Sequence, residues 1–216
     1  MIRLHHIPGS RSMRVLWLLE ELGLSYDLQH WSLTDGSLRS PEFLAMSPAG
    51  RIPALEIDDR AIFESGAIVQ YLTEREGRLA PQPGDPERAD FLEWVSYAET
   101  QGATLQSLNI QHIFLRPEAA RSIPMMKLET KRLAVTARAL ENQLSDRETL
   151  LRSGFSAADC MMGFNIDALF RYVPAADYPA LAGYRDRMEA RPAYLRAIEK
   201  GGDSMYARDF YEIPDA

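Results

Sequence analysis

Cysteine is almost absent from this chain of 216 residues, with Cys160 alone. A single cysteine excludes an internal disulfide and a C-x-x-C redox pair. Long apolar runs are missing as well, since no stretch approaches the roughly 20 residues that span a bilayer. Basic residues are the minority, 24 Lys and Arg against 31 Asp and Glu, and the net charge of −7 disfavours nucleic acid or an anionic membrane as a partner. The first residues lack the apolar segment of a secretory signal, so we expect a cytoplasmic protein with no membrane partner.

The chain is otherwise composed like a globular domain, with 46% hydrophobic and 25% charged residues. Its length allows one large domain or two smaller ones. The segment 80–86 holds three prolines and a glycine, which makes it the best candidate for a linker. We therefore predict a first domain at residues 1–78, a linker at 79–86 and a second domain at 87–216.

The first 75 residues alternate between strand-like and helix-like patterns. The predicted helix at 13–22 carries its apolar residues at the spacing of one helix face and is followed by Gly23, a common helix stop. The other expected elements are strands at 2–7, 25–33, 54–57 and 61–63 and helices at 41–46 and 66–74. The resulting order βαβαββα predicts an α/β domain with a thioredoxin-like mixed sheet.

After Pro86 no segment has a good strand pattern, so we predict an all-α second domain. Asp85 and Pro86 are suited to open a long helix reaching about His112. Ser156 and Asp159 have the spacing of a capping box at the start of another helix. The remaining helices are expected at 125–144, 178–190 and 192–200.

Residues 50–65 have the features of a peptide-binding slot. Pro53 stands at the entrance of the strand 54–57, where its missing N–H does least harm. If the Ile52–Pro53 peptide is cis, the backbone of Ile52 is turned outward and can pair with another chain. Ser65 is a plausible N-cap for the next helix, whose N-terminus suits a carboxylate, and Arg51 adds a cation at the other end. The pattern predicts a slot with carboxylate anchors at both ends.

This combination resembles the thiol-binding domain of the glutathione S-transferases, with a specific likeness over residues 1–75 and a general one in the helical remainder. The resemblance implies that Ile52–Pro53 is a cis-proline turn pairing with the cysteinyl backbone of glutathione. It also implies that Glu64 and Ser65 hold the γ-glutamyl end and that Arg51 lies near the glycyl carboxylate. The implied activity is conjugation of glutathione, as co-substrate, to an electrophile, with no metal involved. The resemblance also implies a homodimer that acts in detoxification.

A thiol reacts as its thiolate, so such an enzyme needs a group that stabilises the sulfur anion. Ser10 follows Pro8-Gly9 and matches the catalytic serine of the serine-type branches of the family. Ser12 is the alternative, and its other interpretation is a simple cap of the first helix. The first strand offers His5 and His6 rather than a tyrosine, which argues against a tyrosine mechanism. Strand alternation is expected to send one histidine inward and the other outward, each in a packing role.

The family resemblance places the electrophile pocket between the two domains. Its predicted lining mixes aromatic and polar side chains and so favours an amphipathic substrate: Ile7, Tyr97, Gln101, Thr104, Phe114, Tyr206 and Tyr211. Glutathione-dependent isomerases, dehalogenases and peroxidases share this architecture and remain alternatives, as does a non-catalytic glutathione-binding or docking protein. The slot residues Arg51, Ile52, Pro53, Glu64 and Ser65 weigh against the non-catalytic alternative.

Overall fold

A computed structural model of the chain describes residues 1–214. Its contacts divide the chain into two compact units. The first unit joins Met1–Ala89 to Glu189–Met205, and the second joins Asp90–Met188 to the described residues from Tyr206 onward. The predicted boundary at residue 87 assigns all of the C-terminal region to the helical domain, whereas residues 189–205 pack within the first unit.

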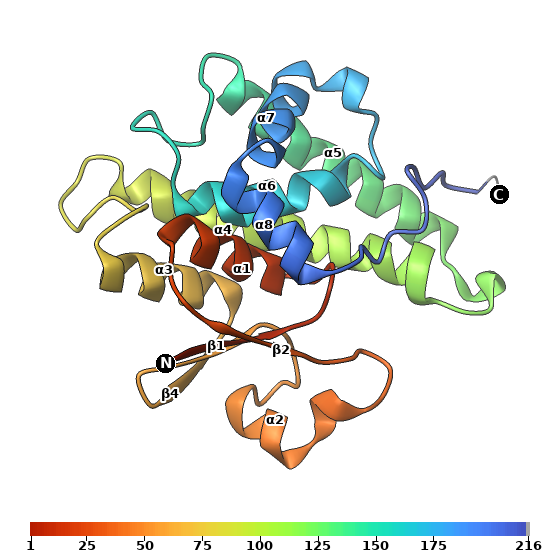
Figure 1. Ribbon diagram of the computed structural model, residues 1–216. Coiled ribbons are helices and arrows are strands. Elements are labelled where there is room, and N and C mark those ends of the chain that lie inside the picture. Colours follow the sequence, from red (N-terminus) through yellow and green to blue (C-terminus); the bar gives the residue numbers. More distant parts are fainter. Residues whose placement is uncertain (215–216) are drawn as a thin grey trace. The chain divides into compact units, whose positions relative to one another are not determined.

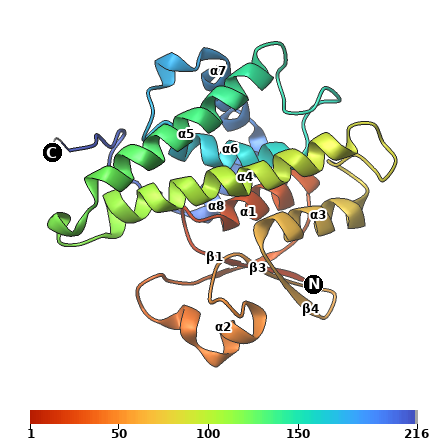
Figure 2. The same ribbon diagram turned by 180° about the vertical axis from the view of Figure 1, so that it is seen from behind.

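The first unit is built on a four-stranded mixed sheet of order β2-β1-β3-β4. β1 pairs in parallel with β2 and antiparallel with β3, which forms a hairpin with β4. Helices α1 and α3 cover one face of this sheet and α2 lies on the other (Figures 1 and 2). The bounds are β1 Ile2–His6, α1 Ser12–Leu22, β2 Asp27–His30, α2 Pro41–Met46, β3 Ala54–Ile57, β4 Arg60–Phe63 and α3 Ser65–Glu76. The predicted βαβαββα order and thioredoxin-like fold are confirmed.

Local chemistry explains why these elements begin and end where they do. Nearly every residue of α1 is buried, and Gly23 ends the helix in the left-handed conformation with φ 69°. The Ser40 hydroxyl accepts a hydrogen bond from Phe43 N–H at the start of α2, and Pro41 occupies its first position. The Ile52–Pro53 peptide is cis, as the family resemblance implied. Residues close together in the sequence therefore determine where many elements of this unit begin and end.

Helix α8, Pro192–Gly201, lies against α1 within the first unit. Arg196 and Lys200 both pair with the nearly buried Glu20, at 2.7 and 2.5 Å. Arg191 binds Glu21 through two nitrogens, at 2.6 and 2.9 Å. These charge-assisted bonds join α1 to α8 and its flanking residue Arg191, and Lys200 and Glu20 lie 180 positions apart in the sequence.

The second unit is helical, as predicted. Its helices are α4 Arg88–Asn109, which begins just inside the first unit, then α5 Ile123–Leu144, α6 Ala157–Leu169 and α7 Pro179–Glu189. The predicted capping box of Ser156 and Asp159 is present at the start of α6. A π-helical turn at Ile110–Phe114, which no sequence signal predicted, continues α4. The tail returns to this unit, where Tyr211 stacks on Tyr172 and its N–H donates to the Arg171 carbonyl at 2.7 Å.

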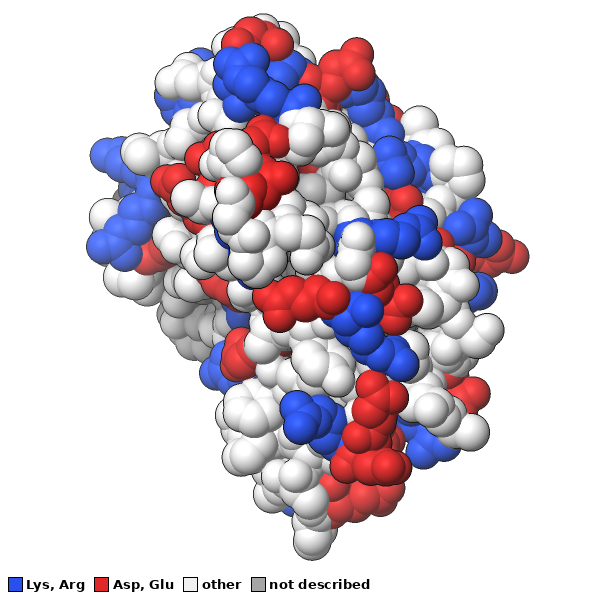
Figure 3. All heavy atoms as spheres, turned by 90° about the vertical axis from the view of Figure 1, so that its left-hand side faces the viewer, with Lys and Arg blue, Asp and Glu red and all other residues white. Residues whose placement is uncertain are grey.

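The described surface carries charges of both signs. Acidic and basic side chains are interspersed over the face shown in Figure 3. Within residues 1–214, no helix combines the length and the apolar character needed to cross a bilayer.

Candidate functional site

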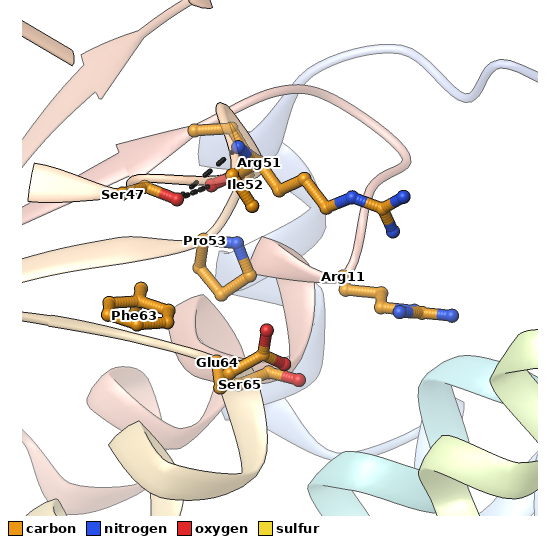
Figure 4. A pocket seen from close by; sticks show the side chains of 9 residues that line it. Arg11, Ser47, Arg51, Ile52, Pro53, Phe63, Glu64 and Ser65 are labelled. Carbon is orange, nitrogen blue, oxygen red and sulfur yellow. Dashed lines mark hydrogen bonds between the residues drawn. The ribbon is translucent and has the colours of Figure 1, made fainter. Parts of the chain in front are cut away.

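The first unit contains a pocket that opens to solvent beside the sheet (Figure 4). All five residues predicted to bind glutathione line this pocket. Arg51, Ile52 and Pro53 belong to the turn before β3, and Glu64 and Ser65 lie at the start of α3. The pocket combines two guanidinium groups with one carboxylate. Its lining is Arg11, Ser47, Ala49, Arg51, Ile52, Pro53, Phe63, Glu64 and Ser65.

Ser47, a residue of the pocket lining, fixes the backbone of Arg51. The Ser47 hydroxyl donates to the Arg51 carbonyl at 2.8 Å and accepts from the Arg51 N–H at 3.3 Å (Figure 4). Ser47 is only 1% exposed, while the Arg51 side chain extends into solvent at the pocket. The guanidinium is thus carried by an ordered backbone and stays available to a ligand carboxylate. The sequence pattern did not single out Ser47, because this role depends on two bonds to the backbone of a turn.

Ser65 lies at the opposite side of the pocket, at the first position of α3. The structure corrects its predicted role as N-cap, since Glu64 occupies that position and makes no side-chain cap. The fully buried Arg14 of α1 donates to the Ser65 hydroxyl at 3.0 Å. The buried cation and the positive end of α3 together make this corner attractive to a carboxylate. The bond from Arg14 to Ser65 was not predicted, because the two residues lie 51 positions apart in the sequence.

Glu64 has an unusual backbone conformation at the edge of the pocket. Its φ is 71°, a value in the left-handed region that few residues other than glycine adopt. Strained residues of this kind cluster at functional sites. The exposed carboxylate of Glu64 supplies negative charge beside the two arginines of the pocket.

The loop between β1 and α1 holds a chain of hydrogen bonds that starts at Ser10. The Ser10 and Ser12 hydroxyl oxygens are 2.8 Å apart, and Ser12 Oγ is 2.7 Å from His6 Nδ1. Ser12 is fully buried, whereas Ser10 is partly exposed. The alternative in which Ser12 caps α1 is wrong, because Arg11 takes the N-cap position without a side-chain bond. Instead, Ser10 Oγ accepts from the Ser12 N–H at 3.3 Å.

Both histidines of β1 are buried, which corrects the expectation that one faces outward. His5 is 3% exposed and lies on one face of the sheet, where it contacts Glu56 and accepts from the Trp31 indole at 2.8 Å. His6 is 0% exposed and reaches the Gly201 carbonyl at 2.8 Å through Nε2. Burial lowers the pKa of His6 to about 4, partly opposed by the hydrogen bond to Gly201. Sequence alternation did not predict burial on both faces, because Trp31 and Phe43 cover His5 while α8 covers His6.

The predicted electrophile-pocket residues are divided between the two units. Ile7 is buried in the first unit after β1. In the second unit Gln101 is buried and donates to Thr136 at 3.1 Å, and the hydroxyl of the buried Tyr211 accepts from the Ala207 N–H at 2.9 Å. The other predicted residues also belong to the second unit: Tyr97 and Thr104 on α4, the exposed Phe114, and Tyr206.

The fold agrees with that of known proteins that this chain resembles. A sequence profile described as the glutathione S-transferase N-terminal domain matches residues 1–74, and the corresponding C-terminal profile matches residues 106–192. The chain belongs to the glutathione S-transferase family. It is therefore a glutathione transferase, as the sequence resemblance predicted.

Two relatives and one solved structure illustrate the range of this family. Glutathione S-transferase 3 of Schizosaccharomyces pombe is 29% identical, over 94% of this chain and 89% of its own length. The disulfide-bond oxidoreductase YfcG of Escherichia coli is 31% identical, over 93% of this chain and 95% of its own. A glutathione transferase of Phanerochaete chrysosporium, solved in complex with oxidised glutathione, is 27% identical with a TM-score of 0.84, covering 93% of this chain and 96% of that one.

Proposed function

We propose that this transferase conjugates the thiolate of glutathione to a hydrophobic or amphipathic electrophile, with Ser10 as the thiolate donor. The observation that carries the proposal is the match of charge in the pocket. Glutathione bears two carboxylates and one ammonium group, and the pocket offers Arg11, Arg51 and the carboxylate of Glu64. In this assignment Arg51 binds the glycyl carboxylate, and Glu64 and Ser65 hold the γ-glutamyl end. The backbone of Ile52, before Pro53, pairs with the cysteinyl residue.

Accessibility favours Ser10 over Ser12 as the donor to sulfur. The Ser12 hydroxyl is buried and contacts His6, Ser10 and the Ile7 N–H, at 2.7, 2.8 and 3.3 Å. Ser10 precedes Arg11, which lines the pocket, and keeps part of its surface exposed. A charge-assisted hydrogen bond together with the positive end of α1 supplies about 1.5–3 kcal/mol, which lowers a thiol pKa by one to two units.

The remaining parts of the proposal follow from the family. We infer that Ile7, Tyr97, Gln101, Thr104, Phe114, Tyr206 and Tyr211 contribute to the electrophile pocket. We also infer a cytoplasmic homodimer that acts in detoxification. Size measurement in solution, with and without glutathione, tests the dimer directly.

A second candidate is reduction of a glutathione-containing disulfide. It is favoured by the 31% identity to a protein named a disulfide-bond oxidoreductase and by relatives solved with oxidised glutathione. In this reaction the glutathione thiolate attacks one sulfur of a disulfide and releases the other as a thiolate. Cys160 is fully buried, so the attacking sulfur is expected to come from glutathione.

A substrate panel with glutathione distinguishes the alternatives. The panel contains chlorodinitrobenzene, a haloalkane, a peroxide, a cis–trans isomerisable enone and a mixed disulfide. Conjugation above the uncatalysed rate, with a kcat that falls strongly in Ser10→Ala, supports the first proposal. Activity confined to one of the other substrates replaces it with the corresponding reaction. Retention on immobilised glutathione with no turnover of any substrate indicates a binding protein.

A further inference from the structure

A continuous hydrogen-bonded chain connects the surface of the β1–α1 loop to a buried histidine. It runs from Ser10 Oγ to Ser12 Oγ at 2.8 Å, from Ser12 Oγ to His6 Nδ1 at 2.7 Å, and from His6 Nε2 to the Gly201 carbonyl at 2.8 Å. All four residues belong to the first unit. His6 and Ser12 are fully buried, and only Ser10 reaches the surface. The chain therefore has one accessible end.

The Gly201 carbonyl determines the direction of every bond in this chain. A carbonyl only accepts, so His6 Nε2 carries the proton and Nδ1 of the neutral ring is an acceptor. The single hydroxyl proton of Ser12 therefore points to His6 Nδ1 at 2.7 Å, a closer acceptor than the Ile7 carbonyl at 3.4 Å. The Ser12 oxygen accepts from the Ile7 N–H at 3.3 Å and from the Ser10 hydroxyl. Both serine protons thus point inward, toward His6.

We propose that His6 receives the thiol proton of bound glutathione through Ser10 and Ser12. The proposal rests on the proposed contact between Ser10 and the sulfur. The S–H bond breaks and its proton passes to Ser10 Oγ, while Ser10 passes its own proton to Ser12 Oγ and Ser12 passes its own to His6 Nδ1. Both serines end neutral, glutathione becomes a thiolate that accepts from Ser10, and His6 becomes an imidazolium.

The chain is fully hydrogen-bonded after this transfer as well as before it. The imidazolium donates to both Ser12 and the Gly201 carbonyl, Ser12 donates to Ser10, and Ser10 donates to sulfur. If the thiol proton left for solvent instead, Ser10 would still have to turn its proton toward sulfur. Either Ser12 would then follow and leave His6 Nδ1 buried without a hydrogen bond, or two oxygens 2.8 Å apart would face each other without a proton between them. Each arrangement carries the cost of an unsatisfied buried polar group.

The resting state suits an acceptor because His6 is unprotonated before the thiol binds. Burial lowers its pKa to about 4, the Gly201 bond opposes this, and His30, whose ring centroid is 5.4 Å away, lowers it further. A thiolate at the end of the chain adds an opposite charge and a hydrogen bond to the protonated form, and both raise the pKa of His6. Proton uptake by His6 is thereby coupled to ionisation of the sulfur.

The decisive measurement is the number of protons released to the medium for each thiolate formed by the unmodified protein. Thiolate is followed by its ultraviolet absorbance as glutathione is added near neutral pH, and released protons are followed in weakly buffered solution with an indicator dye. Binding of S-methylglutathione, which has no thiol proton, corrects for protons from the other groups. We expect fewer than half a proton per thiolate. One proton per thiolate overturns the proposal, and no protein variant is needed to reach that result.

Three variants locate the retained proton. Ser12→Ala interrupts the chain and His6→Asn removes its end, so each is expected to release about one proton for each thiolate that still forms. His5→Asn is the matched control, because His5 is a buried neighbour on the same strand that bonds to Glu56 and Trp31 and has no link to the serines. It is expected to retain the proton as the unmodified protein does. Retention in Ser12→Ala overturns the proposal.

A fourth variant separates this inference from the proposed function. Unchanged thiolate formation in Ser10→Ala means that Ser10 does not act on the sulfur, and both ideas then fail. If thiolate formation is lost in Ser10→Ala but the unmodified protein releases one proton per thiolate, the proposed function stands. Only the role of His6 as proton acceptor is then removed.

Discussion

Two helices of this protein begin with a buried polar cluster that contains a serine, and the two clusters differ in where they end. At the start of α6, Asp159 accepts from the Ser156 N–H at 2.8 Å, the Leu150 N–H at 3.0 Å and the Tyr184 hydroxyl at 3.0 Å. Every partner lies within the second unit and is buried. At the start of α1, the bonds lead outward to the partly exposed Ser10. A closed cluster stabilises the fold alone, whereas an open one also offers a hydrogen bond to a ligand.

The largest expected effect comes from breaking the closed cluster. Asp159→Ala leaves two backbone N–H groups and the Tyr184 hydroxyl buried without their acceptor, so we expect a loss of about 3–5 kcal/mol in the free energy of unfolding. Urea denaturation followed by circular dichroism measures this change. Asp146→Ala is the control, because the Asp146 side chain is 55% exposed and pairs with surface arginines, and it should change stability by under about 0.5 kcal/mol. Equal losses in the two variants would contradict the structural role of the Asp159 cluster.

The ion pairs around Glu20, near the end of α1, are expected to weaken in acid and to destabilise the fold. Burial alone would raise the pKa of Glu20, but hydrogen bonds from Lys200, Tyr26 and Arg196 lower it to about 2 from an ordinary value of 4.5. A carboxyl whose pKa is lowered in the folded state stabilises the protein fully above pH 4.5, and this stabilisation is lost as the pH falls toward 2. The shift corresponds to about 3 kcal/mol. Unfolding midpoints between pH 7 and 2.5 should therefore fall more steeply in the unmodified protein than in Glu20→Gln, and parallel curves would contradict the prediction.

The same comparison separates what the sequence predicted from what it did not. The box of Ser156 and Asp159 spans four residues, so a local pattern was sufficient to predict it, and the helix predicted at 41–46 has the bounds of α2. The resemblance over residues 50–65 likewise anticipated the cis peptide and the pocket. By contrast, His6 meets Gly201 across 195 positions. No local pattern encodes that contact, because it exists only once α8 packs on α1.

The open cluster is expected to affect turnover more than stability. Ser10→Ala removes the proposed hydrogen bond to the thiolate, so we expect kcat to fall about 100-fold, while KM for glutathione changes less than about twofold because the pocket residues remain. Ser10→Thr keeps a hydroxyl and should recover part of kcat. The alternative donor is tested by Ser12→Ala. Suppose that Ser12→Ala lowers kcat as far as Ser10→Ala does, while glutathione bound to the Ser10→Ala variant still ionises normally. Ser12 is then the thiolate donor rather than Ser10.

The smallest expected effect comes from a change in the pocket, which should raise KM for glutathione rather than lower kcat. Ser65→Ala removes a hydroxyl held by Arg14 at the N-terminus of α3, where the γ-glutamyl carboxylate is proposed to bind. Losing one hydrogen bond to a charged group should raise KM for glutathione about tenfold, equivalent to about 1.4 kcal/mol, with kcat nearly unchanged. Ser32→Ala is the matched control, because the Ser32 hydroxyl bonds to Thr34 in an exposed loop outside the pocket lining. A fall in kcat at unchanged KM would mean that Ser65 acts on the sulfur rather than in binding the peptide. The proposed difference in role between Ser10 and the pocket residues would then be lost.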